Sequence, residues 1–337
     1  MSGGDPHGQD AAACATFTQD HHVYLVIGGI SSGANELGPC LTKHGVPLIG
    51  ANAGGDARYF AQNHRFIYEP GQASFTRGLS TLVNDLNANG WFNGKHKIGV
   101  VQYEGATYDH AVDDGLVAPL RRMGVALTDR VKYSGVDNNS IAQGSANAVL
   151  KFNTEGIDRV VFMGPGGGAA TYFMNAASSQ RYYPLYGIWT ADSPYVLGIT
   201  AASDQLANAT GIGYQPGLDV ASAQDPTAST PAGKACLAFW DSVGQTDHSA
   251  LNNPLQRASC DIFYTLIRAV AANPQTTSST AALEDGYDAV GGSYSPAGTF
   301  SIRFRAGSHD AAGGYRRLIY ENGCKCFSYV GPTRPLP

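Results

Sequence analysis

A glycine-bounded turn near the N-terminus carries the first residues able to contact a ligand. The segment Gly28-Gly-Ile-Ser-Ser-Gly-Ala follows a short apolar run. A strand that ends in glycine and opens into a helix presents backbone N–H groups and the positive end of the helix dipole. Ser31 and Ser32 add hydroxyl donors, so the turn could hold a carboxylate without lysine or arginine. Both serines are also favoured helix N-caps, and the residues alone favour that capping role.

The six cysteines fall into three local pairs, and pairing each with its neighbour is the simplest arrangement. Closing a loop of ~25 residues stabilises a fold by roughly 3 kcal/mol. Buried free thiols remain an alternative, as does metal ligation by the C-x-C pair, although a lone C-x-C is weak evidence for zinc. Disulfides would place the chain in an oxidising compartment. The pairs are Cys14 with Cys40, Cys236 with Cys260, and Cys324 with Cys326.

No motif indicates catalysis. The nine histidines are scattered, and the sequence contains no H-E-x-x-H, no G-x-S-x-G and no phosphate-binding loop. The glycine run Gly164-Pro-Gly-Gly-Gly lacks the Lys-Ser/Thr that would follow in such a loop. We therefore expect neither an enzyme nor a bound cofactor or metal.

Composition indicates a globular protein and excludes several partners. Of 337 residues, 43% are hydrophobic and 15% are charged, and the formal net charge is -5. With no basic run, nucleic acid is not an expected partner. No apolar stretch approaches the ~20 residues that cross a bilayer. The first residues lack the basic and apolar regions of a signal peptide, which taken literally predicts a cytoplasmic protein.

Short apolar strands alternate with amphipathic helices over the first two thirds of the chain, which predicts parallel sheets covered on both faces. A stretch rich in Pro, Ser and Thr, 215–233, predicts a loop or crossover. The end of the chain, Gly298–Phe304 and Tyr315–Tyr329, predicts an antiparallel hairpin. The expected strands are Val23–Gly29, Val46–Gly50, Lys97–Gln102, Asp158–Gly164 and Leu185–Trp189; the expected helices are 31–43, Phe75–Asn89, Tyr108–Met123, Ala169–Ser178, Ala232–Val243 and Pro254–Ala272.

This order of elements resembles the branched-chain amino-acid binding proteins of ABC importers, which have the type I periplasmic-binding fold. The resemblance covers nearly the whole chain, and no single motif is diagnostic. It is carried by Gly4-Asp-Pro, Val26-Ile-Gly-Gly-Ile-Ser-Ser, Gly45-Val-Pro-Leu-Ile-Gly-Ala-Asn-Ala, Ile98-Gly-Val-Val, Tyr108, Gly156-Ile-Asp-Arg-Val-Val and Tyr183-Pro-Leu-Tyr-Gly. Cys14 and Cys40 lie where some family members carry a disulfide.

The resemblance implies an α/β fold of two Rossmann-like lobes joined by three crossovers that form a hinge. The first lobe would contain residues 1–94 and 218–295, and the second 95–217 and 296–337. Ligand would bind in the cleft between the lobes and close the hinge. The family's first strand and helix are missing at the start, so we expect a longer gene product with a signal peptide, and with a lipoprotein anchor as one option.

In the first lobe, the resemblance places Ser32 at a ligand-binding serine, with Ser31 beside it. The loop after the following strand offers Ala53, which matches the family. Gly54 stands where relatives carry a hydroxyl residue, and Asn52 is the residue expected to compensate. This departure weakens the case for an α-amino acid.

In the second lobe, Tyr108 matches a cleft tyrosine and Tyr103 lies nearby. Gly166 and Gly167 replace an aromatic-bearing loop, which leaves room for a bulkier ligand. Asp192 follows a strand where relatives place an acidic residue that pairs with the ligand's ammonium group, with helix N-capping as its alternative role. Trp189 is expected to be a wall of the site or a cation–π partner.

The predicted function is that of an extracytoplasmic solute-binding protein, monomeric and not an enzyme. It would capture an amino acid, an amide or a carboxylate-like ligand and present it to the membrane subunits of an ABC importer. A ligand-sensing receptor domain of the same fold is the alternative. An enzyme on this fold is less favoured.

Overall fold

The computed structural model describes residues 6–28, 36–50, 54–135, 137–249, 252–277 and 279–337. The chain divides into two compact units, each assembled from two segments. Unit 1 contains Met1–Ser74 and Pro226–Gly314, and unit 2 contains Phe75–Asp225 and Tyr315–Pro337. The chain therefore passes from one unit to the other three times.

These units differ from the lobes expected from the sequence at all three boundaries, because residues 75–94 and 218–225 belong to unit 2 and residues 296–314 belong to unit 1. Helix α4 (Phe75–Ala88) belongs to unit 2, because its leucines pack onto the larger sheet: a Cβ at Gly187 would lie 2.8 Å from Cδ1 of Leu86. The segment 298–313 belongs to unit 1. Its Ala311 N–H donates to the Glu69 carbonyl oxygen at 2.9 Å, which ties the segment to the first half of that unit.

Among the described residues, unit 2 contains a seven-stranded sheet in the order β10-β9-β8-β7-β6-β4-β5. Strands β4 to β8 run parallel to one another, and β9 is antiparallel to β8. The strands are β4 (Ile98–Tyr103), β5 (Leu127–Tyr133), β6 (Arg159–Met163), β7 (Leu185–Trp189), β8 (Ala209–Gly213), β9 (Gly314–Glu321) and β10 (Cys326–Pro335).

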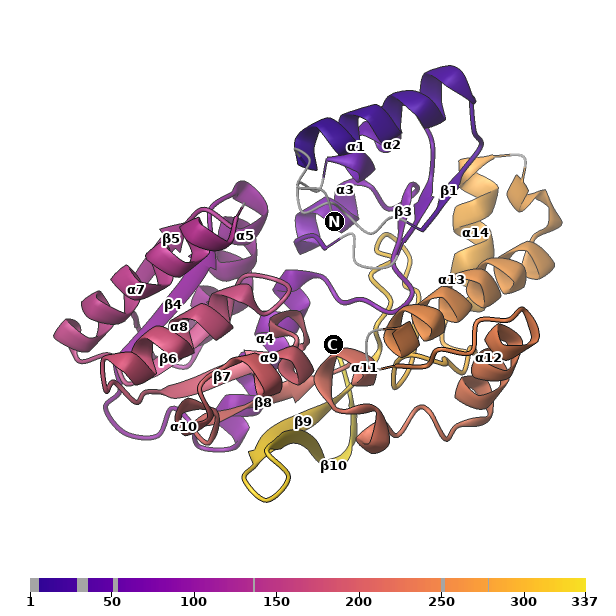
Figure 1. Ribbon diagram of the computed structural model, residues 1–337. Coiled ribbons are helices and arrows are strands. Elements are labelled where there is room, and N and C mark those ends of the chain that lie inside the picture. Colours follow the sequence, from indigo (N-terminus) through magenta and orange to yellow (C-terminus); the bar gives the residue numbers. More distant parts are fainter. Residues whose placement is uncertain (1–5, 29–35, 51–53, 136, 250–251, 278) are drawn as a thin grey trace. The chain divides into compact units, whose positions relative to one another are not determined.

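Helices cover both faces of this sheet. Phe162 of β6 packs against Phe173 of α8 (Gly168–Ser179), with ring centroids 5.5 Å apart, and α7 (Asn138–Glu155) lies beside α8 (Figure 1). Helix α4 covers the opposite face. The remaining helical segments of unit 2 are α5 (Ala106–Val112), the π-helical η2 (Asp113–Val117), α6 (Ala118–Arg122), η3 (Thr190–Asp192), α9 (Pro194–Thr200), α10 (Ser203–Leu206), α11 (Pro216–Asp219) and η4 (Ser222–Gln224).

In its described part, unit 1 has a three-stranded parallel sheet in the order β1-β2-β3. One core joins Tyr68 of β3 to Tyr287 of α14, whose rings stack with centroids 4.4 Å apart. The elements are α1 (Pro6–Ala15), η1 (Thr16–Asp20), β1 (Val26–Ile27), α2 (Leu37–Lys43), β2 (Leu48–Ile49), α3 (Ala57–Gln62), β3 (Ile67–Tyr68), α12 (Pro231–Ser242), α13 (Asn252–Ala272), η5 (Pro274–Thr277) and α14 (Thr280–Val290).

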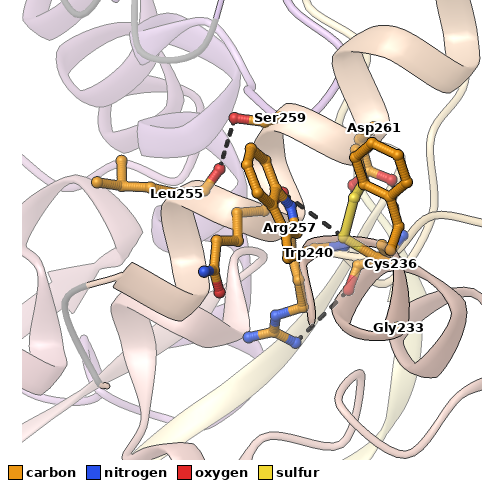
Figure 2. Close-up of a disulfide and its surroundings, with 12 residues drawn as sticks. Gly233, Cys236, Trp240, Leu255, Arg257, Ser259 and Asp261 are labelled. Carbon is orange, nitrogen blue, oxygen red and sulfur yellow. Dashed lines mark hydrogen bonds between the residues drawn. A yellow bond between two sulfur atoms is a disulfide. The ribbon is translucent and has the colours of Figure 1, made fainter. Parts of the chain in front are cut away.

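All three neighbour pairs of cysteines form disulfides, as the spacing predicted. Cys236–Cys260 joins α12 to α13, and Figure 2 shows Trp240 and Arg257 around it. The Trp240 indole N–H donates to the Gln256 carbonyl oxygen at 3.0 Å. A covalent bond and an indole hydrogen bond thus hold the same pair of helices together.

The C-terminal hairpin was predicted with the wrong first strand. Gly298–Phe304 forms no strand and contributes only the isolated bridge between Ile302 and Ala312. Tyr315–Tyr329 instead contains most of β9, the turn at Cys324 and Lys325, and the start of β10. The turn within this stretch escaped prediction because it contains a single glycine, Gly323, beside the cysteines.

Candidate functional site

The strand order of unit 2 identifies where a ligand would bind. From β4 the chain moves to β5 on one side and then returns to β6 on the other side. In open parallel sheets, ligands bind beyond the carboxyl ends of the strands where the connections diverge in this way. Here those ends are Tyr103, which closes β4, and the loop that begins at Gly164 after β6. Both were predicted from the sequence as ligand contacts.

The Tyr103 side chain fills a space that is open because three neighbouring residues are glycines. A Cβ would lie 2.5 Å from the Tyr103 ring at Gly135, 2.9 Å from it at Gly164, and 2.9 Å from its hydroxyl oxygen at Gly168. The hydroxyl oxygen accepts a hydrogen bond from the Ala169 N–H in the first turn of α8. Burial is the main cause that raises the pKa of Tyr103, so the phenol stays neutral and available as a donor.

Tyr108 is the partly exposed member of the aromatic group at this edge. Its ring contacts Tyr103 edge-on, with centroids 6.0 Å apart, and stacks on Phe75 at 5.9 Å. Tyr108 lies in α5, which begins just after β4. The helix therefore holds a half-buried tyrosine beside a buried one, with one ring still open to solvent.

The glycine loop between β6 and α8 lies against the segment after β7. Gly166 donates its N–H to the Ala191 carbonyl oxygen at 2.8 Å. Gly166 and Gly167 have φ values of 86° and 79°, which favour glycine. At Gly167 a Cβ would also lie 2.6 Å from the Asp192 carbonyl oxygen, so no larger residue fits there. The loop is thereby packed against the backbone of Ala191 and Asp192.

Asp192 is fully buried and only partly hydrogen-bonded. Its Oδ2 accepts from the Trp189 backbone N–H at 3.0 Å, and its Oδ1 has no partner among the described residues. Desolvation raises the pKa of this carboxyl well above its ordinary value, and the one backbone hydrogen bond lowers it only in part. Ser193, the next residue, has a left-handed φ of 48°, a conformation that stores strain and recurs at functional sites.

Trp189 has a different place from the one predicted. It is 0% exposed and lies within unit 2 between Phe75, at 6.2 Å between centroids, and Gly78. Its indole N–H donates to the Phe162 carbonyl oxygen at 3.3 Å. The Trp189 ring is therefore buried within unit 2, where it holds the end of β7 in place. It fits against α4 because Gly78 has no side chain.

A second buried carboxyl, Asp219, was not predicted from the sequence. Its Oδ2 accepts hydrogen bonds from Thr190 Oγ1 at 3.2 Å, from the Gln215 N–H at 3.0 Å and from the Tyr329 hydroxyl at 2.6 Å. Desolvation raises its pKa to about 8 despite these donors. Thr190 precedes Asp192 by two residues, so one network connects the candidate site to α11 and β10. No sequence motif marks Asp219, since two of its partners, Thr190 and Tyr329, come from distant segments.

Replacing Asp219 with asparagine is expected to change how stability depends on pH. With a folded-state pKa near 8 and an unfolded value of about 4, the folded protein binds more protons between those limits. The stability contribution of Asp219 therefore falls as pH rises from about 4 to about 8. The amide of the Asp219→Asn variant mimics the protonated acid and removes this fall, which amounts to at most ~1.4 kcal/mol per pH unit. Urea unfolding of both proteins at pH 5 and pH 8 measures it, and parallel profiles would contradict it.

The ligand contacts predicted for the first lobe lie mostly outside the described residues. These are Ser31, Ser32, Asn52 and Ala53. Gly54 is described and lies in a coil segment before α3. The strands that precede these positions, β1 and β2, are parallel and in register, and Gly28 donates its N–H to the Ile49 carbonyl oxygen at 2.9 Å. Both strands therefore end at the same edge of the unit 1 sheet.

Two further features bear on function. Among the described residues, no helix combines the length and apolar character needed to span a bilayer. One group with metal-ligand atoms within 4.8 Å of one another occurs in the described part of the chain, formed by Cys14, Cys40 and His44. Both of its sulfurs are bonded to each other, so they are not thiolate ligands.

Comparison with known proteins identifies the fold. No family model matches the sequence, and no curated protein matches it. Among solved structures, a possible leucine/isoleucine/valine-binding protein from Rhodopirellula baltica SH 1 is 15% identical, with a TM-score of 0.67 over 98% of this chain and 83% of that one. A branched-chain amino-acid ABC transporter protein from Thermus thermophilus with bound valine is 14% identical, with a TM-score of 0.67 over 98% and 82%.

A third similar structure extends the range of ligands. The solute-binding protein of an ABC transporter from Rhodopseudomonas palustris BisB5, in complex with 3,4-dihydroxybenzoic acid, is 13% identical, with a TM-score of 0.65 over 98% of this chain and 84% of that one. At sequence identities this low, the similarity to these structures establishes the fold alone. The chain has the type I periplasmic-binding fold, with parallel sheets and helices on both faces, as the sequence predicted.

Proposed function

We propose that this protein is an extracytoplasmic solute-binding protein that captures a small polar or amphipathic ligand for an ABC importer. The observation that carries the proposal is Asp192 Oδ1, a buried carboxyl oxygen without a partner among the described residues. It lies at the carboxyl edge of the unit 2 sheet together with Tyr103 and Tyr108. Buried polar atoms are normally hydrogen-bonded, so an orphan oxygen at such an edge is a docking point for a ligand donor.

The chemistry of the unit 2 residues favours a ligand with an N–H or O–H donor and an apolar body. An ammonium group next to Asp192 would favour the ionised carboxyl and offset its desolvation. A hydroxyl group would suit the neutral acid. The tyrosines supply apolar ring surface together with hydroxyl groups, and of Gly166 and Gly167 only Gly166 has open space around its Cβ position.

The ligand's anionic group is assigned to unit 1. In this proposal the backbone and hydroxyl groups of Ser31, Ser32 and the Asn52–Gly54 loop hold a carboxylate, as the resemblance implies. Hinge closure between the units, monomeric state, lipid anchoring and contact with importer membrane subunits are parts of the same proposal. Three disulfides support an oxidising, extracytoplasmic compartment.

A panel of amino acids, amides and aromatic carboxylic acids tests the proposal by thermal shift. A ligand at 100 times its dissociation constant stabilises the fold by about 2.7 kcal/mol, which gives a clear upward shift of the melting temperature. The absence of a shift from every class, in a protein that melts cooperatively, would count against a solute-binding role for this chain.

For the ligand so identified, Tyr108→Ala and Asp192→Asn are each expected to weaken binding about 10- to 100-fold, which corresponds to about 1.4–2.8 kcal/mol. Isothermal titration calorimetry measures the change. Tyr183→Ala is the matched control, because Tyr183 is 52% exposed and precedes β7 at the amino end of the strand. Unchanged affinity in both site variants would show that the ligand binds elsewhere.

A further inference from the structure

We propose that the Cys324–Cys326 disulfide is a thiol–disulfide exchange site for low-molecular-weight thiols, a role separate from solute binding. The bond closes over a single intervening residue at the turn between β9 and β10. Cys324 and Lys325 are exposed and Cys326 is half-buried. Exchange requires an approaching thiolate to reach a sulfur atom, and this turn gives it that access.

The other two disulfides differ in accessibility. Cys236 and Cys260 are 0% and 4% exposed, and Cys14 is 1% exposed while its partner Cys40 is half-buried. Each of these bonds closes a loop of 24 or 26 residues in sequence separation, so each restricts the unfolded chain much more than Cys324–Cys326 does. The chain therefore contains two structural disulfides and one exposed disulfide that constrains little.

The surroundings of the exposed bond distinguish its two sulfurs. The Gln224 side-chain amide nitrogen lies 2.9 Å from Cys326 Sγ and 3.8 Å from Cys324 Sγ. Ser328 Oγ lies 3.9 Å from Cys326 Sγ. An N–H donor next to a sulfur stabilises the thiolate that develops when the bond breaks. Cys326 Sγ is therefore the expected leaving group, and the sulfur of the more exposed Cys324 is the expected point of attack by the external thiolate.

The backbone at this turn adds a second reason for lability. Lys325 has φ 54°, in the left-handed region that residues other than glycine adopt at a cost. It is the one residue between the two cysteines, so the ring holds it there. Opening the ring by reduction frees Lys325 to relax, which favours the reduced state relative to an unstrained disulfide.

The exchange proceeds in two steps. A thiolate attacks Cys324 Sγ, the S–S bond breaks, and Cys326 leaves as a thiolate beside the Gln224 amide and is then protonated by solvent. A second thiolate attacks the external sulfur of this mixed disulfide and releases Cys324. Two external thiols supply two electrons and two protons, giving one external disulfide and the Cys324/Cys326 dithiol. An external disulfide reverses the sequence.

The test uses the full chain, with the other two disulfides as internal standards. The protein is incubated with reduced and oxidised glutathione at graded ratios, quenched with acid, alkylated and analysed by peptide mass spectrometry. We expect Cys324 and Cys326 to be alkylated at least ten times faster than the other four cysteines. The trapped mixed disulfide should carry glutathione on Cys324. Reduction of all three bonds at one rate, or glutathione mainly on Cys326, would overturn the proposal.

The Gln224→Ala variant tests whether the Gln224 amide assists exchange at this bond or whether solvent exposure alone accounts for its reduction. It removes the amide donor and is expected to slow reduction of Cys324–Cys326 by about 3- to 10-fold, with the other two disulfides unaffected. Gln245→Ala, a glutamine exposed after α12, serves as the control. If Gln224→Ala reduces at the wild-type rate, the amide plays no part and the assigned direction of attack is wrong.

Discussion

Trp189→Ala is expected to destabilise the protein by about 3–5 kcal/mol, the usual effect of truncating a buried tryptophan. The side chain is 0% exposed and lies over Gly78 of α4. Truncation leaves a cavity between α4 and the end of β7, and it removes the indole hydrogen bond to the Phe162 carbonyl oxygen. Urea unfolding at neutral pH measures the loss.

Trp189→Phe and Gly78→Ala complete this test. Phenylalanine retains part of the volume, so its cost should be clearly smaller than that of alanine. Alanine at Gly78 would overlap the Trp189 ring and should destabilise the native state although the substitution favours a helix. Trp240→Ala is the matched control, because Trp240 is only half-buried. A loss below about 1 kcal/mol for Trp189→Ala would mean that the ring is not a packing element.

Removal of the Cys236–Cys260 disulfide has the second largest expected effect. The chain-entropy relation predicts a loss of about 3 kcal/mol for the Cys236→Ala/Cys260→Ala double variant, because the bond spans about 25 residues of unfolded chain. α12 and α13 would still be joined by the Trp240 hydrogen bond to Gln256. We therefore expect a folded but less stable protein, with a lower midpoint in urea unfolding.

The matched control is Cys324→Ala/Cys326→Ala, whose bond closes over one residue. The same relation gives it less than about 2 kcal/mol, so the two double variants should differ clearly. Equal losses would show that the entropy of loop closure does not determine what these bonds contribute. Exposure of Cys324 at the surface also means that its removal leaves no buried cavity.

The fold class and much of the candidate site could be predicted from the sequence. Apolar runs such as Ile98–Tyr103 are buried on both faces, so they form continuous hydrophobic segments that indicate parallel strands. The disulfide pairs followed from their spacing, since each cysteine had one close neighbour. Tyr103, the glycine loop and Asp192 were named from the family resemblance, and their role as ligand contacts stays a prediction.

Other elements depended on tertiary packing and left little local signal. β5 is an edge strand with alternating polar and charged residues, and its burial is mostly partial. β8 is a short run of small residues, Ala209–Gly213, that pairs with β7 and with the distant β9. The assignment of α4 to unit 2 depends on leucines that meet Gly187 about 100 residues later in the chain. No local pattern encodes such partners.

The burial of Trp189 and the hydrogen-bond network around Asp219 also depend on tertiary packing. Sequence placed Trp189 at a strand end, where a ligand wall is reasonable, but the missing side chain of Gly78 gives the ring a buried position. Asp219 acquires its raised pKa from burial and its hydrogen-bond donors from Thr190 and Tyr329, which only folding brings together. The sequence by itself thus determined the buried parallel strands such as β4, β6 and β7 and the residues that follow them, because those properties are local. Tertiary structure determined which of these side chains are buried, since burial depends on contacts between distant segments.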